Sequence, residues 1–275
     1  MRRAAGAVAT RAASTASIFR DSAANKTGLS FALDGTMRSG AHDMKVFGSG
    51  ALAALSSRQA AAAFFLGHYH VYSAMERHLD ACDAASPTGA LWQRVGGSLR
   101  RGAALEQDVL SLGTQPQEPP SPATERYVHR LATAAASPLP LLLSHFYVRY
   151  FADLFGGSML GRPTRAALLL PRTPAFYVHD AAVTQDRRAY IEQLYASLNE
   201  AGRAARLDQA ATAALVSEAE AAFALNAELY REAAPQGIGL AGLFGLAFVG
   251  GARVAAGLAV EAVKLGWPVS CKPYH

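Results

Sequence analysis

The stretch LLLSHFYVRYFADLFGGSML, residues 141–160, decides the fold of this chain. Its apolar residues recur at helical spacing, yet it also carries Arg149, Asp153 and the pair Gly156-Gly157. Each glycine costs a helix about 1 kcal/mol relative to alanine. A helix keeps such a pair where its backbone bends or lies against something bulky and flat. Asp153, three residues before Gly156, would lie beside that object. The stretch therefore predicts a helix kinked over a planar ligand, or a helix that descends from one.

The composition of the whole chain predicts an all-α fold. The 275 residues are 51% hydrophobic and 17% charged, which suffices for one large helical domain or two small ones. Alanine, leucine, arginine and glutamate fill long segments, which favours helix, and few segments alternate β-branched residues as strands do. Helical spacing is clear over residues 59–82, 91–112 and 208–232. We expect a bundle of roughly six to eight helices, forming one domain over residues 31–235.

The first thirty residues have the composition of a leader. They carry four arginines before the first acid, Asp21, and alanine, serine and threonine fill most of the rest. This composition is typical of an organellar transit peptide, so we expect residues 1–30 to be a mitochondrial leader. A plastid leader has a similar composition, and a basic tail without any targeting role is the other alternative. Much of the formal net charge of +5 lies near this end, so the charge does not indicate a nucleic-acid surface.

The carboxyl end, residues 236–275, is an apolar segment. Residues 238–252 carry no charge, and the apolar character resumes after Arg253 as far as Trp267. A bilayer span needs about 20 apolar residues, and small residues at every fourth position permit close helix packing in membranes. These small residues are Ala247, Gly251, Ala255 and Ala259. We therefore expect membrane contact, or contact with subunits of a membrane protein complex, through residues 238–267. A buried hairpin packed on the helical domain is the alternative.

Five short blocks along the chain carry a family resemblance. They are YHVYSAME (69–76), RGAALEQDV (101–109), ERYVHRL (125–131), LLLSHFYVRYFADLFGG (141–157) and AFALNAELY (222–230). Together, and in this order, they resemble the heme oxygenase family over roughly residues 37–232. The resemblance implies an all-α, heme-oxygenase-like bundle in which heme lies between a proximal and a distal helix. It also implies that heme is both cofactor and substrate, cleaved to biliverdin, iron and carbon monoxide.

The resemblance assigns roles within the fourth block, which would be the distal helix. Asp153 would hold an ordered water network that supplies protons, and Gly156 and Gly157 would present bare backbone to the bound ligand. Tyr147 matches a tyrosine that faces a heme propionate. Considered without the resemblance, Asp153 is a helix-surface acid paired with Arg149 four residues earlier.

The proximal side and the propionate end match the family less well. His42, in RSGAHDMKVF, is the candidate proximal ligand of the heme iron; its alternative is an ordinary packed or surface histidine. Ala152 stands where the distal signature expects a glycine, and Phe155 stands where it expects a small polar residue. Glu192 and Ala196 occupy positions where the family's propionate-binding lysine and arginine are expected. A carboxylate facing a propionate is a like-charge contact that costs free energy.

These departures lead to a preferred prediction and two alternatives. The preferred prediction is a heme-oxygenase-fold protein with a degenerate site and no cofactor, serving as a non-catalytic structural subunit of a mitochondrial membrane complex. The first alternative is an active, membrane-associated heme oxygenase, with heme as its cofactor. The second is a heme carrier or sensor that binds heme without cleaving it.

Overall fold

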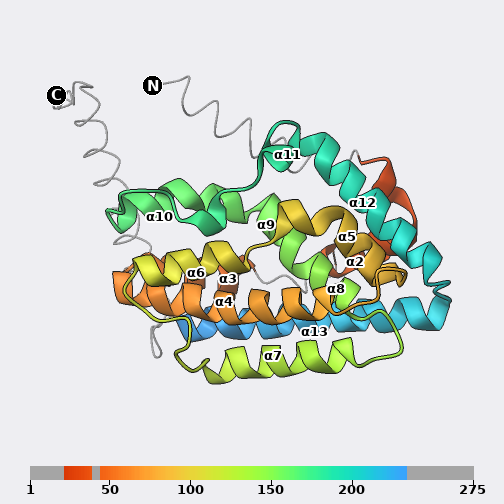
Figure 1. Ribbon diagram of the computed structural model, residues 1–275, viewed down its shortest axis with the longest axis horizontal. Coiled ribbons are helices and arrows are strands. Elements are labelled where there is room, and N and C mark those ends of the chain that lie inside the picture. The colour runs from red at the N-terminus through yellow and green to blue at the C-terminus, as the bar shows by residue number, and fades with distance from the viewer. Residues whose placement is uncertain (1–21, 39–43, 234–275) are drawn as a thin grey trace.

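The computed structural model describes residues 22–38 and 44–233, and every regular element within these ranges is a helix. The all-α fold expected from the sequence is therefore confirmed for this part of the chain (Figure 1). Most of the leader predicted over residues 1–30 and all of the segment predicted over 236–275 lie outside it, so both stay predictions. In chain order the elements are η1 (Ala24–Lys26), α2 (Gly28–Arg38), α3 (Met44–Ala54), α4 (Arg58–Asp80), α5 (Pro87–Leu99), α6 (Gly102–Ser111), α7 (Pro122–Ala135), α8 (Leu142–Phe146), η2 (Tyr147–Phe151), α9 (Ala152–Phe155), η3 (Gly157–Leu160), α10 (Gly161–Ala167), η4 (Ala175–Tyr177), α11 (Ala181–Thr184), α12 (Arg187–Ala204) and α13 (Gln209–Ala233).

The central helix of the bundle is α4. Ser57 caps its first turn by accepting a hydrogen bond from the backbone N–H of Ala60 at 3.0 Å. Buried side chains, among them Phe65, Tyr72 and Leu79, then recur along the helix at heptad spacing. The helix packs against α3, α5, α6, α7 and α13, and Figure 1 shows α13 running alongside it with α7 below both. Helix α4 also packs against α8, the first helix of the stretch that contains Asp153 and the glycine pair; we call this stretch, from α8 to η3, the distal segment.

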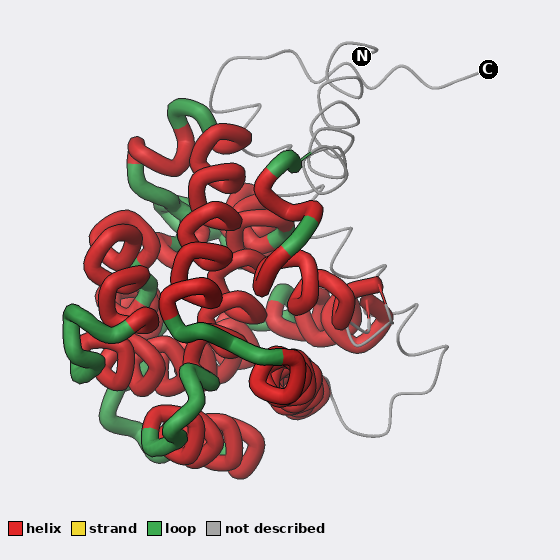
Figure 2. The backbone as a smooth tube through the Cα atoms, turned by 90° about the vertical axis from the view of Figure 1, so that its right-hand side faces the viewer, coloured by secondary structure: helices red, strands yellow, loops and turns green. Residues whose placement is uncertain are grey.

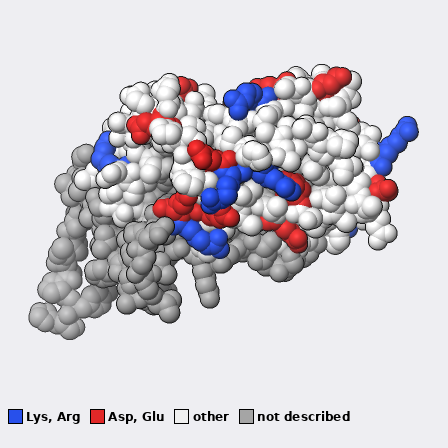
Figure 3. Space-filling model, turned by 90° about the horizontal axis from the view of Figure 1, so that it is seen from below, with Lys and Arg blue, Asp and Glu red and all other residues white. Residues whose placement is uncertain are grey.

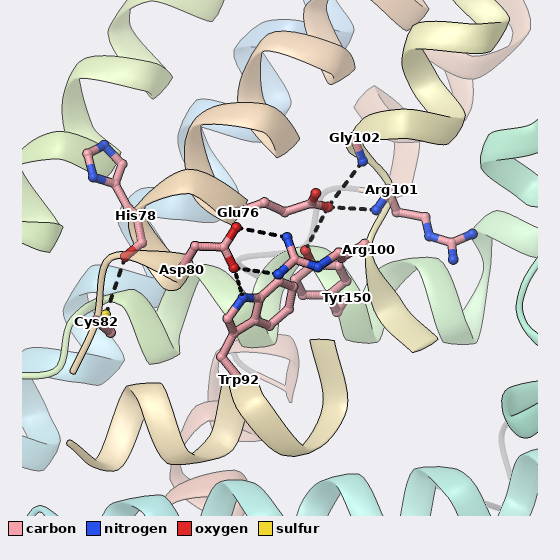
Figure 4. A network of polar contacts seen from close by, with 9 residues as sticks. All are labelled: Glu76, His78, Asp80, Cys82, Trp92, Arg100, Arg101, Gly102 and Tyr150. Carbon is pink, nitrogen blue, oxygen red and sulfur yellow. Dashed lines mark hydrogen bonds and ion pairs between the residues drawn. The ribbon is translucent and has the colours of Figure 1, made fainter. Parts of the chain in front are cut away.

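The helical stretch expected over residues 91–112 is divided in the structure into two helices, α5 and α6. The carboxylate of Glu76 on α4 accepts hydrogen bonds from the backbone N–H groups of Arg101 at 2.6 Å and Gly102 at 3.1 Å (Figure 4). It thereby satisfies donors at the start of α6 that no helical carbonyl can reach. The hydroxyl of Tyr150 donates to the same carboxylate at 3.1 Å. One buried acid thus sets the break between two helices and links it to the distal segment.

One side of the bundle is covered by α12, which packs against η1, α2 and α5. Asp186 caps its start by accepting a hydrogen bond from the backbone N–H of Ala189 at 3.0 Å. Its buried face presents Ile191, Leu194 and Tyr195 to the interior. In Figure 2, which views the bundle from its right-hand side, the described chain consists of such helices joined by loops.

The lower face of the molecule carries mixed charge. Figure 3 shows acidic and basic side chains intermingled on it, and Arg126 of α7 pairs with Glu228 of α13 at 2.7 Å. A face of this kind gives a polyanion no continuous basic surface. None of the helices in the described ranges combines the length and the apolar character that a bilayer span requires.

Candidate active site

The distal segment is a succession of short helices rather than one straight helix. Helix α8, Leu142–Phe146, leads into a π-helical turn, Tyr147–Phe151, which leads into α9, Ala152–Phe155. Gly156, with φ −128° and ψ −39°, departs from helical geometry, and a 3-10 turn begins at Gly157. The bend predicted at the glycine pair is therefore observed. The π-helical turn, a rare conformation that often marks functional sites, is a second irregularity that the sequence did not indicate.

Asp153 lies in the interior of the bundle. Only 9% of its surface is exposed, and Tyr72 of α4 donates its hydroxyl hydrogen to the carboxylate oxygen Oδ2 of Asp153. Burial raises the pKa of Asp153 to about 6, against the opposing effects of Arg149 and of the Tyr72 hydrogen bond. Asp153 is therefore not the surface acid of the simpler interpretation. A carboxyl group with this pKa gains and loses its proton close to neutral pH.

Arg149 is the fixed charge beside this carboxyl group. It is buried, its Nη1 donates to Oδ1 of Asn226 on α13, and its guanidinium carbon lies 4.7 Å from the centroid of the Tyr72 ring. Burial disfavours its charge, but Tyr72, Tyr127 and Asp153 outweigh burial and raise its pKa. The guanidinium therefore stays protonated. We call Tyr72, Tyr127, Arg149, Asp153 and Asn226 the distal polar network.

Two donors of the distal polar network have no acceptor among the residues the structure describes. The Nε of Arg149 and the hydroxyl of Tyr127 are buried there without a hydrogen-bond partner. Burial raises the pKa of Tyr127 to about 12, so this hydroxyl keeps its hydrogen. Buried polar groups in native proteins are nearly always satisfied by protein atoms or ordered water. The two donors therefore mark a place for water or ligand atoms beside the fixed cation. Such an arrangement can hold a proton and pass it on.

Gly156 has no packing reason to be glycine. Its φ is negative, and a Cβ atom built on it would meet only the carbonyl oxygen of Ala152, at 3.7 Å, among the atoms described around it. A glycine with room for a side chain leaves its backbone open to an approaching group, which is the role that the resemblance implies for Gly156. The surroundings of Gly157 lie outside the described part of the structure. Ala152 itself is half-buried. Phe155 packs against Tyr195 of α12, with ring centroids 6.4 Å apart.

The opposite end of the distal segment, which we call the Tyr147 end, meets carboxylates of the chain itself. The hydroxyl of Tyr147 donates to Oδ1 of the buried Asp34 at 2.7 Å, and Nδ2 of Asn25 donates to Oδ2 of Asp34 at 3.2 Å. Oε1 of Glu192 accepts a hydrogen bond from the backbone N–H of Ala24 at 2.6 Å. The resemblance implies cations here that hold two propionates. Acidic side chains at these places repel a carboxylate.

Heme therefore fits the two halves of the site unequally. The distal polar network and Gly156 fit a ligand whose chemistry needs protons, whereas Asp34 and Glu192 do not fit the propionates. His42 lies outside the described residues, in the interval between α2 and α3, so its role as proximal ligand stays a prediction. Within the described ranges there is no group of three or more histidine, cysteine or acidic side chains that could hold a metal ion by itself.

Sequence reasoning identified Asp153 but missed three other residues of the distal polar network, and it also missed Asp34 beside Tyr147. Tyr72, Tyr127 and Asn226 each lie inside one of the family-like blocks, so the blocks were the available signal. Asp34 lies outside all five blocks, and its only signal was an acid among apolar residues in FALDG.

Comparison with known proteins points to one family. The family model described as heme oxygenase matches residues 42–232. Heme oxygenase 1 of Rattus norvegicus is 33% identical over 168 residues, which are 60% of this chain and 56% of the rat protein. Heme oxygenase 1 of Nostoc sp. is 30% identical over 201 residues, 72% of this chain and 79% of that protein. The chain thus matches little more than half the length of the rat protein.

A solved structure extends the similarity to three dimensions. The crystal structure of heme oxygenase-1 from the cyanobacterium Synechocystis sp. in complex with heme superimposes with a TM-score of 0.60 at 27% identity. The superposition covers 74% of this chain and 90% of that one. The matching family model, the relatives and the shared fold together establish that the chain belongs to the heme oxygenase family.

Proposed function

We propose that this protein binds heme and cleaves it oxidatively. The observation that carries the proposal is the distal polar network, in which Asp153 is buried beside the fixed charge of Arg149 and within one helical turn of Gly156. The similarity to proteins named heme oxygenase supports the same reaction class. Heme, when bound, would supply the iron at which oxygen is activated. The chain would orient the ligand, limit the access of water and deliver protons.

Each member of the distal polar network has a defined part in proton delivery. Tyr72 holds the carboxyl group of Asp153 through its hydroxyl, while Asn226 holds Arg149. The donors Arg149 Nε and Tyr127 hydroxyl would bind water that carries protons to and from Asp153. A positioned acid of this kind contributes roughly 10²- to 10⁴-fold to a rate.

The test compares Asp153→Asn with the unchanged protein. Hemin is titrated into the full chain while the Soret band is recorded, and a reductase and oxygen are then supplied while biliverdin is measured. The variant should bind hemin with an affinity within a few-fold of the original and form biliverdin at least tenfold more slowly, because only the titratable proton is lost. Glu200→Gln, an exposed change on α12, is the matched control and should leave both quantities unchanged. An unchanged protein that binds hemin but forms no biliverdin would refute the proposed reaction.

A second candidate function is a non-catalytic structural subunit of a mitochondrial membrane complex, with no cofactor. The Tyr147 end favours it, since Glu192 and Ala196 stand where the resemblance expects the lysine and arginine that hold the propionates, and Asp34 adds a second acid beside Tyr147. The leader composition of residues 1–30 and the apolar segment 238–267 support a mitochondrial location and contact with membrane subunits. Absence of any Soret shift, together with co-migration of the protein with a membrane complex on native gels of mitochondria, is the expected result for this candidate. A freely migrating protein that shifts the Soret band would eliminate it.

A further inference from the structure

We infer that the Tyr147 end of the site excludes carboxylate groups, because the chain fills it with a carboxylate of its own, and that the ligand edge reaching this end is uncharged. The inference rests on the proposed function only in taking the ligand to be a heme-type macrocycle. It concerns which form of that macrocycle the site accepts.

Tyr147 has already committed its hydrogen. A tyrosine hydroxyl has one hydrogen to donate, and that of Tyr147 goes to Oδ1 of Asp34 at 2.7 Å in the interior of the bundle. A ligand carboxylate arriving at this hydroxyl would meet only oxygen lone pairs. Asp34 thus takes the place that a propionate would need.

Asp34 is built into the fold rather than carried on a loose surface chain. It is 6% exposed, and its second oxygen accepts a hydrogen bond from Nδ2 of Asn25 in η1 at 3.2 Å. Two hydrogen bonds from α12 hold η1, which carries Asn25. Oε1 of Glu192 accepts from the backbone N–H of Ala24 at 2.6 Å, and Nδ2 of Asn199 donates to the carbonyl of Ala24 at 2.7 Å. Both acids are therefore tied to the same three-residue turn.

The start of α2 is also hydrogen-bonded to α12. Oδ1 of Asn199 accepts from the backbone N–H of Ser30 at 2.8 Å. Gly28, with φ +80°, permits this approach, since a Cβ atom there would lie 2.7 Å from the same oxygen. The helix that carries Asp34 is thus anchored to α12, and Asp34 stays in position when a ligand arrives.

Charge at this end then selects among ligands. Asp34 and Glu192 are both acids, and Ala196, one turn beyond Glu192 on α12, contributes no charge. Repulsion between carboxylates is strong where the surroundings are poorly solvated. A macrocycle whose acid groups are masked avoids that repulsion, whereas one with free acid groups does not.

The test measures the ratio of two dissociation constants in the full chain, that of hemin divided by that of hemin dimethyl ester, both from Soret titrations. In the unchanged protein we expect a ratio of one or more. Asp34→Asn with Glu192→Gln removes both charges but keeps an acceptor for Tyr147 and for Ala24, and should lower the ratio at least threefold. Glu200→Gln, two turns beyond Glu192 and in contact with Arg94 of α5, is the matched control and should leave the ratio unchanged. Circular-dichroism melting verifies that each variant is folded.

Each outcome decides the inference. A ratio that falls less than threefold in the double variant overturns it. If the unchanged protein binds neither probe, hemin binding gained by the double variant supports the inference and removes the proposed function, while no gain overturns the inference. If the unchanged protein binds a probe but forms no biliverdin, the proposed reaction fails and the ratio still tests the ligand preference.

Discussion

His145 and Glu218 form a buried pair, with Nε2 of His145 2.8 Å from Oε1 of Glu218, and this pair ties the distal segment to α13. Neither side chain is more than 2% exposed. Nε of Arg130 on α7 also donates to Oε1 of Glu218, at 2.9 Å, so three helices meet at one carboxylate. Because His145 lies one turn before Arg149, the pair also holds in place the helical turn that leads to Arg149.

Removal of the Glu218 carboxylate should lower the free energy of unfolding. Glu218→Ala leaves the buried imidazole of His145 without its partner, and we expect a loss of about 3 kcal/mol in the free energy of unfolding. Glu228→Ala, which breaks the exposed pair with Arg126 on the same two helices, should cost less than about 1 kcal/mol. Urea denaturation followed by circular dichroism measures both. Equal losses for the two variants would mean that the buried pair contributes no more to stability than the exposed pair.

The lowered pKa of Glu218 should make the stability of the protein depend on pH. Burial opposes the charge of Glu218, but hydrogen bonds from His145 and Arg130 outweigh burial and lower its pKa to about 2. Because the folded-state pKa lies below the unfolded value of 4.5, the stabilisation is present above pH 4.5 and is lost as the pH falls towards 2. Urea midpoints between pH 5 and pH 3 should fall steeply for the unchanged protein and less steeply for Glu218→Ala.

The raised pKa of Asp153 should make stability depend on pH with the opposite sign. Its pKa rises from 3.8 to about 6 on folding, chiefly through burial, so the unfolded chain releases this proton at a lower pH than the folded one. Stability should therefore fall as the pH rises from about 4 to about 6. Asp153→Asn removes this loss, and near pH 7 it should be more stable than the unchanged protein by about 3 kcal/mol. Urea denaturation at pH 4 and pH 7 measures the difference. A variant less stable at pH 7 would show that the ionised carboxylate is well accommodated.

Gly156 should be dispensable for folding and important for the ligand. Gly156→Ala places a methyl group 3.7 Å from the nearest described atom at a negative φ, so the free energy of unfolding should change by less than about 1 kcal/mol. Hemin binding, however, should weaken about tenfold if the macrocycle lies on this backbone. Gly97→Ala on the exposed side of α5, where nothing lies within 4 Å of the new methyl group, is the control and should leave hemin binding unchanged. Equal hemin affinities for both variants would remove Gly156 from the binding surface.

The long helices were predictable because their signal is local. Apolar spacing placed helices over residues 59–82 and 208–232, and the structure has them at Arg58–Asp80 and Gln209–Ala233. The break inside residues 91–112 was not predictable in the same way, since its cause is the carboxylate of Glu76, about 25 residues earlier in the chain and brought close only by packing.

The candidate site likewise has a part that was predictable from local sequence and a part that depends on packing. The glycine pair and an acid one turn before it indicated Asp153, because these residues lie in one stretch. Its partner Tyr72 is 81 positions away in the chain, and Asp34 is 113 positions from Tyr147. Which distant side chain completes a buried hydrogen bond depends on how the helices pack, and no spacing rule along the chain contains that information.

Glu76 is the residue on which both the α5–α6 break and the distal segment depend. Burial raises the pKa of this carboxyl, while the N–H groups of Arg101 and Gly102 and the hydroxyl of Tyr150 oppose the shift. Glu76→Ala leaves these three donors without their acceptor in the interior, so we expect a loss of about 3 kcal/mol in the free energy of unfolding. Glu76→Gln keeps a neutral acceptor and should lose only about 1 kcal/mol.

Two measurements separate this effect from general destabilisation. Amide hydrogen exchange at residues 101 and 102 should accelerate in Glu76→Ala far more than exchange within α7, because those N–H groups lose their own acceptor. Glu106→Ala, an exposed change on α6, should alter neither quantity by much. Because Tyr150 adjoins Arg149 on the π-helical turn, loss of its acceptor should also loosen the turn that positions the distal polar network. Uniform acceleration along the whole chain would instead mean that Glu76 stabilises the bundle without fixing the break.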